Sequence, residues 1–239
     1  FNGEIYNHAE LRRELEAAGR SFRSRCDTEV VLHGWLEWGN ECFRRFRGMF
    51  AAALWQERER RLVLARDRLG IKPLYVYRHG RDLHFGSELK ALFAHPGVPR
   101  RIDPQALSDF LSLNYIPAPR TMAAGIGKLP AGHWLEWRGG ECRSEAFWRL
   151  DFHPRPRLSE EDALLEFDRL MRSALREHMV ADVPVGVWLS GGLDSSAIVH
   201  YAAAESPRPL RTYSIVFPGR SFDERPFSRL IASRYGTVH

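Results

Sequence analysis

In this 239-residue chain, the stretch "VWLSGGLDSSA", residues 187–197, is the strongest indication of the fold. Apolar residues lead into a serine, two glycines follow, and Asp194 stands before two more serines. A strand that runs through glycines into a helix gathers backbone N–H groups at one point, and the helix N-terminus adds positive potential. The stretch therefore predicts an anion-binding loop between a strand and a helix.

The residue types of this loop suggest phosphate and a metal ion. Gly191 and Gly192 leave the backbone bare, so that an anion can approach it. Hydroxyl donors come from three serines, Ser190, Ser195 and Ser196. Asp194 would repel a phosphate unless Mg²⁺ lies between the two, so we expect Asp194 to bind Mg²⁺. The competing interpretation is a Gly-Gly turn in which Asp194 caps the helix.

Three familiar loops do not fit this stretch. The lysine of a Walker A loop is missing, and the spacing of the glycines differs from the dinucleotide-binding pattern. A nucleophile elbow would need glycine at position 188, where this chain has Trp188. A serine hydrolase built on Ser190 stays open as an alternative of another class.

Outward from the loop, the second half of the chain alternates strands and helices. Ser159 and Asp162 begin a long amphipathic helix that runs to about Met179 and carries Leu165 and Leu170 among its apolar positions. Strands are expected at 183–189 and 210–217, and further helices at 195–205 and 223–236. Because fully apolar strands such as 183–189 are typical of parallel sheets, we expect an α/β domain with a parallel sheet.

The first half has a different pattern of predicted elements, in which helices are followed by short antiparallel strands. Asn7 is expected to cap a helix that ends at Gly19, and Asp27 begins another that ends at Gly39. Strands are expected at 48–55, 61–67, 73–78 and 82–87, and a hairpin about "RGG" at 132–148. Two short helices lie between them, at 87–95 and 103–113. This pattern predicts an α+β domain.

The boundary between the two halves lies in "DFHPRPRLSEED", which is rich in proline and charge. We assign residues 1–150 to the first domain, 151–158 to a linker and 159–239 to the second domain. The chain opens with "FNGEIYN" and lacks an initiator methionine, so we interpret it as an internal piece of a longer chain with no signal peptide.

Composition excludes several classes of partner. The net charge is +5, but the basic residues are interleaved with acids and form no stripe, so no nucleic-acid partner is expected. No apolar run is long enough to span a membrane. The three cysteines, Cys26, Cys42 and Cys142, are far apart and predict neither a metal cluster nor a disulfide framework. A cytoplasmic location fits this cysteine usage.

The motifs together carry a family resemblance. "SGGLDSS" resembles the pyrophosphate loop of the ATP pyrophosphatases, which cleave ATP to AMP and pyrophosphate. "FNGEIYN", "DTEVVLHGWLEWG", "GMFAAALW", "ARDRLGIKPLY", "SELKAL" and "DVPVGVWLSGGLDSS" resemble, in the same order, glutamine-hydrolysing asparagine synthetase and its relatives. The resemblance covers essentially the whole chain.

The resemblance implies two coupled activities. The first domain would be a class II glutamine amidotransferase of the N-terminal-nucleophile hydrolase fold, which releases ammonia from glutamine. The second would be the start of a Rossmann-like ATP-pyrophosphatase domain that adenylates a carboxylate with ATP and Mg²⁺. Aspartate is the family's default acceptor acid. Relatives that close β-lactam rings, amidate other acids or accompany exopolysaccharide systems stay open, as does a nucleotide-binding relative without activity.

The resemblance also assigns residues to the glutamine site. Asn2 and Gly3 match the oxyanion hole, which stabilises the developing charge when glutamine is attacked. Glu4 and Asp27 match positions that hold the α-amino group of glutamine. The plainer interpretation is that "NGE" is a turn and that Asp27 only caps a helix.

One departure affects the expected activity. The family nucleophile is a cysteine at the mature N-terminus, and this chain begins with Phe1 downstream of that position. Cys26 is interpreted as a packed thiol and not as a substitute. Residues 1–239 alone are therefore expected to lack glutaminase activity.

In the second domain, the resemblance extends the nucleotide site beyond the loop itself. The resemblance implies that Leu189 and Ile215 contact the nucleotide base. Apolar residues at the ends of adjacent parallel strands also suit an adenine slot. The ATP-binding residues expected are Leu189, Ser190, Gly191, Gly192, Leu193, Asp194, Ser195, Ser196 and Ile215. Core packing is the alternative for each apolar residue. The expected partners are glutamine, ATP and aspartate or another carboxylic acid, with a homodimer as a further expectation.

Overall fold

The computed structural model describes residues 1–152, 158–216 and 223–239, and the chain divides into two compact units, Phe1–Phe152 and His153–His239. Residues 153–157 of the expected linker lie outside the described residues, and so does residue 217 of the expected second strand. Each unit has hydrophobic cores of its own.

The first unit contains two antiparallel sheets. The larger sheet has the order β1-β2-β3-β7-β8, with β1 (Asn2–Ile5), β2 (Gly48–Gln56), β3 (Arg61–Arg66), β7 (His133–Arg138) and β8 (Glu141–Ala146). The smaller has the order β5-β4-β6, with β4 (Tyr75–His79), β5 (Asp82–Gly86) and β6 (Ile126–Lys128). The expected strands and the hairpin about "RGG" are confirmed, whereas β1 and β6 were not predicted.

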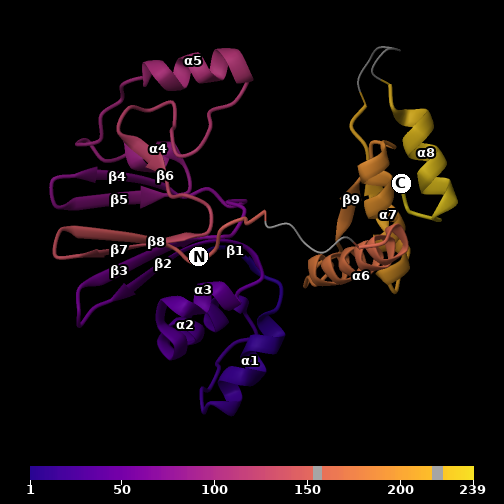
Figure 1. Cartoon of the computed structure of the whole chain (residues 1–239), viewed down its shortest axis with the longest axis horizontal. Helices are drawn as coiled ribbons and strands as arrows, with labels where there is room; N and C mark the ends of the chain where they lie inside the picture. The colour runs from indigo at the N-terminus through magenta and orange to yellow at the C-terminus, as the bar shows by residue number, and fades with distance from the viewer. Residues whose placement is uncertain (153–157, 217–222) are drawn as a thin grey trace. The chain divides into compact units, whose positions relative to one another are not determined.

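Layering follows from the alternation of side chains along the strands of the larger sheet. Ala52 and Leu54 on β2 face a core shared with the helices, while Ala51 faces a core shared with the smaller sheet. The helices of that core are α1 (His8–Ala17), α2 (Asp27–Trp38) and α3 (Cys42–Arg45), the last reached through the short 3₁₀ turn η1 (Gly39–Glu41). Figure 1 shows these helices on one side of the larger sheet and β4 and β5 on the other. The expected α+β architecture is confirmed.

The smaller sheet is covered on its outer face by α4 (Leu89–Phe93), whose Leu92 packs with Tyr77 of β4 and Ile126 of β6. Farther along the chain, α5 (Pro104–Leu113) begins at Asp103, whose side chain accepts hydrogen bonds from two backbone N–H groups of the first turn. Each expected short helix is therefore present.

The second unit holds a parallel pair of strands between helices. β9 (Gly186–Trp188) and β10 (Arg211–Tyr213) pair in parallel, and Val238 adds a parallel bridge beside Arg211. The helices are α6 (Glu160–His178), α7 (Leu193–Glu205) and α8 (Arg225–Arg234). Buried Leu189, Val199 and Ala232 form the centre of the core. The expected α/β architecture with a parallel sheet is confirmed, although both strands are shorter than predicted.

Two helix starts test the capping predictions. Ser159 caps α6 as expected, because its hydroxyl accepts a hydrogen bond from the N–H of Asp162. The prediction that the Asn7 side chain caps α1 is wrong. Asn7 is buried and accepts from the N–H of Arg47 at 2.8 Å while its amide donates to the carbonyl of Arg45 at 3.1 Å. Its side chain thus ties the start of α1 to the segment before β2.

Candidate functional site

The glutamine-site candidates of the first unit begin on β1, which lies at the edge of the larger sheet. Gly3 pairs with Phe50 of β2 and has a φ of +152°, a conformation that side chains rarely adopt. A Cβ atom at Gly3 would lie 2.1 Å from the carbonyl oxygen of Met49, closer than any real contact. Only glycine therefore allows β1 to approach β2 this closely.

Asp27 lies beside the end of β1. Its Oδ2 accepts a hydrogen bond from the backbone N–H of Ile5 at 2.9 Å, directly after Glu4. The alternative that Asp27 caps α2 is not supported, because Cys26 occupies the N-cap position and the carboxylate is engaged by β1. This hydrogen bond joins Ile5 and Asp27, which are 22 positions apart in the sequence, and it places Asp27 beside the residue that follows Glu4.

Asn2 is exposed and is oriented by a residue that the sequence analysis did not assign. The amide Nδ2 of Asn2 donates to Oγ of Ser87 at 3.2 Å, across 85 positions of the sequence. A primary amide carries two N–H donors, so this bond leaves one N–H for another acceptor. Ser87 was visible only as the first letter of "SELKAL", and no local pattern links it to Asn2.

The turn after β3 depends on a buried carboxylate, which the sequence analysis also missed. Asp67 is fully buried, and its oxygens accept hydrogen bonds from four backbone N–H groups, those of Phe50, Leu69, Ile71 and Lys72. The neighbouring Arg66 donates to three carbonyls, those of Gly70, Lys72 and Leu129. Burial lowers the pKa of Arg66, and the negative charge of Asp67 opposes that shift. Asp67 thus ties this turn to β2, the partner of β1, while Arg66 closes the turn itself.

Cys26 is exposed, so the prediction of a packed thiol is wrong. Its Sγ lies 3.4 Å from Oδ1 of Asp27 and 3.3 Å from Oγ1 of Thr28. The thiol thus contacts the candidate substrate-binding carboxylate. Cys42, by contrast, is buried, and desolvation raises its thiol pKa above the ordinary range.

In the second unit, the "SGGLDSS" loop connects β9 to α7, and its hydroxyls fold back onto its own backbone. Oγ of Ser190 and Oγ of Ser195 lie 2.9 Å apart. The N–H of Gly191 donates to Ser195 Oγ and the N–H of Gly192 donates to Ser190 Oγ, both at 3.2 Å. The first N–H groups of α7 have no partner within the helix, as at any helix start. Several donors therefore converge at one helix N-terminus.

Gly191 is required here for two reasons. Its φ is +87°, and a Cβ atom there would lie 2.5 Å from Cβ of Phe227 and 2.6 Å from the backbone nitrogen of Ser228. Ser228 lies on α8 and is fully buried. The loop therefore presses directly against α8, and glycine is the one residue that fits.

A cavity of about 230 Å³ opens beside the loop at the carboxyl ends of the two parallel strands. Its lining residues are Trp188, Leu189, Ser190, Tyr213, Ser214, Ile215, Glu224 and Arg225. Leu189 and Ile215, predicted as base contacts, thus line the same cavity as the first serine of the loop. Leu193 and Ser196 do not line it, and they border a separate hollow with Phe167.

Asp194 lies in the first turn of α7 with its side chain exposed. Among the described residues, its carboxylate has no hydrogen-bond or ion-pair partner, so the alternative of a helix cap is not supported. No group of three or more candidate metal-ligating side chains occurs in the described part of the chain. A single free carboxylate at a candidate phosphate-binding loop is compatible with Mg²⁺, which keeps most of its waters and takes one or two protein carboxylates.

Family models match both units of the chain. Residues 1–148 match the glutamine amidotransferase domain family, and residues 166–239 match the asparagine synthase family. The chain therefore belongs to the glutamine-hydrolysing asparagine synthetase family.

Two synthetases are among the relatives of this chain. Asparagine synthetase [glutamine-hydrolyzing] 3 of Bacillus subtilis is 37% identical over 100% of this chain and 41% of its own length. Asparagine synthetase B of Escherichia coli is 32% identical over 100% of this chain and 40% of its own length. Among solved structures, a glutamine phosphoribosylpyrophosphate amidotransferase from B. subtilis aligns with a TM-score of 0.44 and 18% sequence identity. The alignment covers 92% of this chain and 47% of the amidotransferase chain. The chain spans about two fifths of the length of the two synthetases.

None of the helices in the described ranges has the length and apolar character needed to cross a membrane.

Proposed function

We propose that the protein containing this chain is a glutamine-dependent asparagine synthetase. Its first unit hydrolyses glutamine to glutamate and ammonia. Its second unit transfers AMP from ATP to the carboxylate of aspartate, which releases pyrophosphate. Ammonia then attacks the adenylated carbonyl and AMP leaves, so that asparagine forms. Adenylation is needed because a free carboxylate is negatively charged and offers ammonia no good leaving group.

The observation that carries this proposal is the cavity beside the "SGGLDSS" loop. Leu189 and Ile215 give it apolar walls at the ends of adjacent parallel strands, which suits an adenine ring. Ser190 borders the same cavity and leads into the glycines and the N-terminus of α7, which suit the phosphates. Phosphate binding would replace the contacts that the loop hydroxyls now make with the N–H groups of Gly191 and Gly192.

In this proposal Asp194 holds the Mg²⁺ that accompanies ATP. When bound, the ion would neutralise phosphate charge and so favour the departure of pyrophosphate. The exposed carboxylate, free of any partner among the described side chains, supports this role.

The first unit supplies the proposed glutamine site. Asn2 and Gly3 would donate to the oxyanion formed when the side-chain amide of glutamine is attacked, and Glu4 and Asp27 would bind the α-ammonium group. The hydrogen bond between Asp27 and the N–H of Ile5 supports this arrangement, because it holds a carboxylate at the end of the strand that carries the other three residues.

The alternatives of other classes have less support. A serine hydrolase built on Ser190 would need a base beside the hydroxyl. Among the described residues, Ser190 Oγ instead forms hydrogen bonds with Ser195 Oγ and the N–H of Gly192. A nucleotide-binding relative without activity would not need a free acid in the loop. A cytoplasmic enzyme fits the three free cysteines, and a homodimer stays part of the proposal.

The proposal is tested by incubating the full-length protein with ATP, Mg²⁺ and aspartate, and with either glutamine or ammonia as the nitrogen source. We expect equal amounts of asparagine, AMP and pyrophosphate with both sources. Other carboxylic acids run in parallel report the acceptor. Pyrophosphate release with another acid and not with aspartate would show that the product is not asparagine. ATP binding without pyrophosphate release would refute the proposed ligase activity.

A further inference from the structure

Glu29 accepts three hydrogen bonds close to Asp27 of the proposed glutamine site, and the proposed function does not use it. It lies in the first turn of α2, two residues after Asp27. Its Oε1 accepts the N–H of Arg23 at 2.8 Å, and its Oε2 accepts the N–H and the hydroxyl of Ser24 at 2.8 and 2.6 Å. Both oxygens are therefore committed to the loop that precedes the helix.

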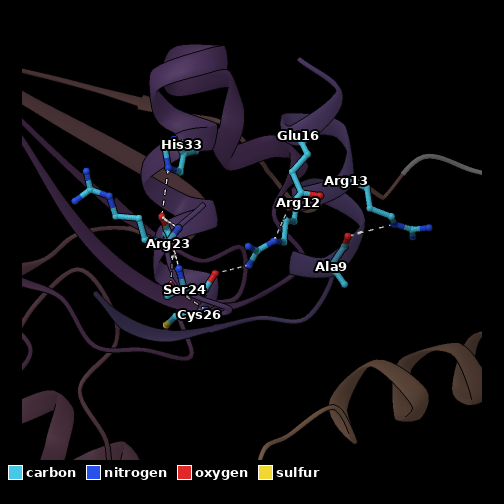
Figure 2. Close-up of polar contacts among 9 residues, drawn as sticks. Ala9, Arg12, Arg13, Glu16, Arg23, Ser24, Cys26 and His33 are labelled. Carbon is cyan, nitrogen blue, oxygen red and sulfur yellow. Dashed lines mark hydrogen bonds and ion pairs between the residues drawn. The ribbon is translucent and has the colours of Figure 1, made fainter. Parts of the chain in front are cut away.

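This loop leads directly to Asp27. Oγ of Ser24, which donates to Glu29, accepts the N–H of Cys26 at 3.2 Å. Cys26 then contacts Oδ1 of Asp27 through its thiol at 3.4 Å. Figure 2 shows Arg23, Ser24 and Cys26 gathered below His33, with dashed lines marking their polar contacts. A continuous path of hydrogen bonds thus joins the Glu29 carboxylate to the side chain of Asp27.

A second contact holds the loop from the side of α1. Nη1 of Arg12 donates to the carbonyl of Ser24 at 2.6 Å (Figure 2). The Arg12 guanidinium also lies 4.3 Å from the ring centroid of Phe22. Arg12 is itself fixed by an ion pair with Glu16 at 2.9 Å. The loop is therefore held by hydrogen bonds to both α1 and α2.

The Glu29 side chain is negatively charged at neutral pH. The hydrogen bond from the Ser24 hydroxyl, followed by that from the N–H of Arg23, lowers the pKa of Glu29 to about 2. His33 lies on the next turn of α2, and its Nε2 is 3.6 Å from Oε1 of Glu29. A carboxylate whose oxygens are already taken by the loop has little capacity left for a substrate ammonium, so a direct binding role is disfavoured.

We propose that Glu29 is a positioning residue for glutamine recognition, which fixes loop 23–26 so that Asp27 is held at the end of β1. This inference rests on the proposed function of Asp27 and names a residue that acts through it. Loss of the Glu29 charge would let the loop and the Asp27 carboxylate move, and the binding of the glutamine α-ammonium would weaken. The chemistry at the reacting amide, which depends on β1, would change little.

The test uses the full-length protein with Glu29→Gln, which keeps the size of the side chain but replaces one acceptor oxygen with a donor. We expect the KM for glutamine to rise about tenfold with kcat within about twofold of the parent. Synthesis from added ammonia should be unchanged, because it bypasses the first unit. Glu37→Gln is the matched control, since Glu37 lies on the same helix and pairs with Arg20 at 2.8 Å, away from the loop.

A second variant guards against a folding defect in the first. Ser24→Ala keeps the carboxylate of Glu29 and removes the hydroxyl that links it to Cys26, so it should raise the KM for glutamine in the same direction. An unchanged KM in both variants overturns the inference, and so does a parallel loss of glutamine- and ammonia-dependent synthesis, which marks a general structural role. A parent protein that uses ammonia but not glutamine would instead refute the proposed function of the first unit.

Discussion

Replacing Gly191 with alanine tests whether the nucleotide loop is held in shape by its contact with α8. At a φ of +87° an alanine is strained by about 1–3 kcal/mol. The added Cβ would also lie 2.5 Å from Cβ of Phe227 and 2.6 Å from the backbone nitrogen of Ser228, and backbone in a helix cannot yield as a flexible side chain can. We therefore expect a loss of at least about 2 kcal/mol in the unfolding free energy of the second unit.

The neighbouring glycine provides the matched control. Gly192 has a φ of −71°, and a Cβ there would meet nothing closer than Ser190 Oγ at 3.4 Å. Gly192→Ala should change the stability by less than about 1 kcal/mol.

Hydrogen exchange of the α8 amides measures the local free energy, and pyrophosphate release under saturating ATP measures the function. Gly191→Ala should accelerate exchange in α8 and lower pyrophosphate release by about 10²-fold, because the loop is displaced by about an ångström. Equal exchange rates in the two alanine variants would refute the argument from close approach.

Three further outcomes are expected. Asn2→Ala in the full-length protein should lower glutamine-dependent turnover by about 10²–10³-fold, the usual cost of an oxyanion donor, and should spare synthesis from ammonia; a parallel loss of both routes would mark Asn2 as structural. Asp194→Asn should abolish pyrophosphate release across a Mg²⁺ titration while sparing glutamine hydrolysis, and a near-parental rate with an unchanged Mg²⁺ midpoint would exclude the metal role. The lowered pKa of Glu29, about 2 against an ordinary 4.5, means that its stabilising contribution is complete above the ordinary value and is lost as the pH falls between the two. The difference in unfolding free energy between the parent and Glu29→Gln should therefore shrink in acid titrations over that window, and a constant difference would contradict the assignment.

Local signals in the sequence predict most of the helices and strands and their order along the chain. Apolar periodicity, glycines and prolines are local signals. They predicted most of the strands, the change from antiparallel to parallel strands, and every helix of the described residues except the short α3 and η1. The loop at residues 190–196 was also readable, because its glycines and hydroxyls follow one another along the chain and need no distant partner to be recognised.

Contacts between residues that are far apart in the sequence could not be predicted and are seen in the folded structure alone. Asn7 is a residue type that often caps helices. In the folded structure its side chain is buried and forms hydrogen bonds with the backbone of Arg45 and Arg47 instead of capping α1. Cys26 looked like a packing residue and lies exposed against Asp27. The contacts of Asp27 with β1 and of Ser87 with Asn2 span 22 and 85 positions, respectively. Such pairs depend on how the sheets and helices stack, and the energy of that packing belongs to the assembled core and is not encoded in any short stretch of sequence.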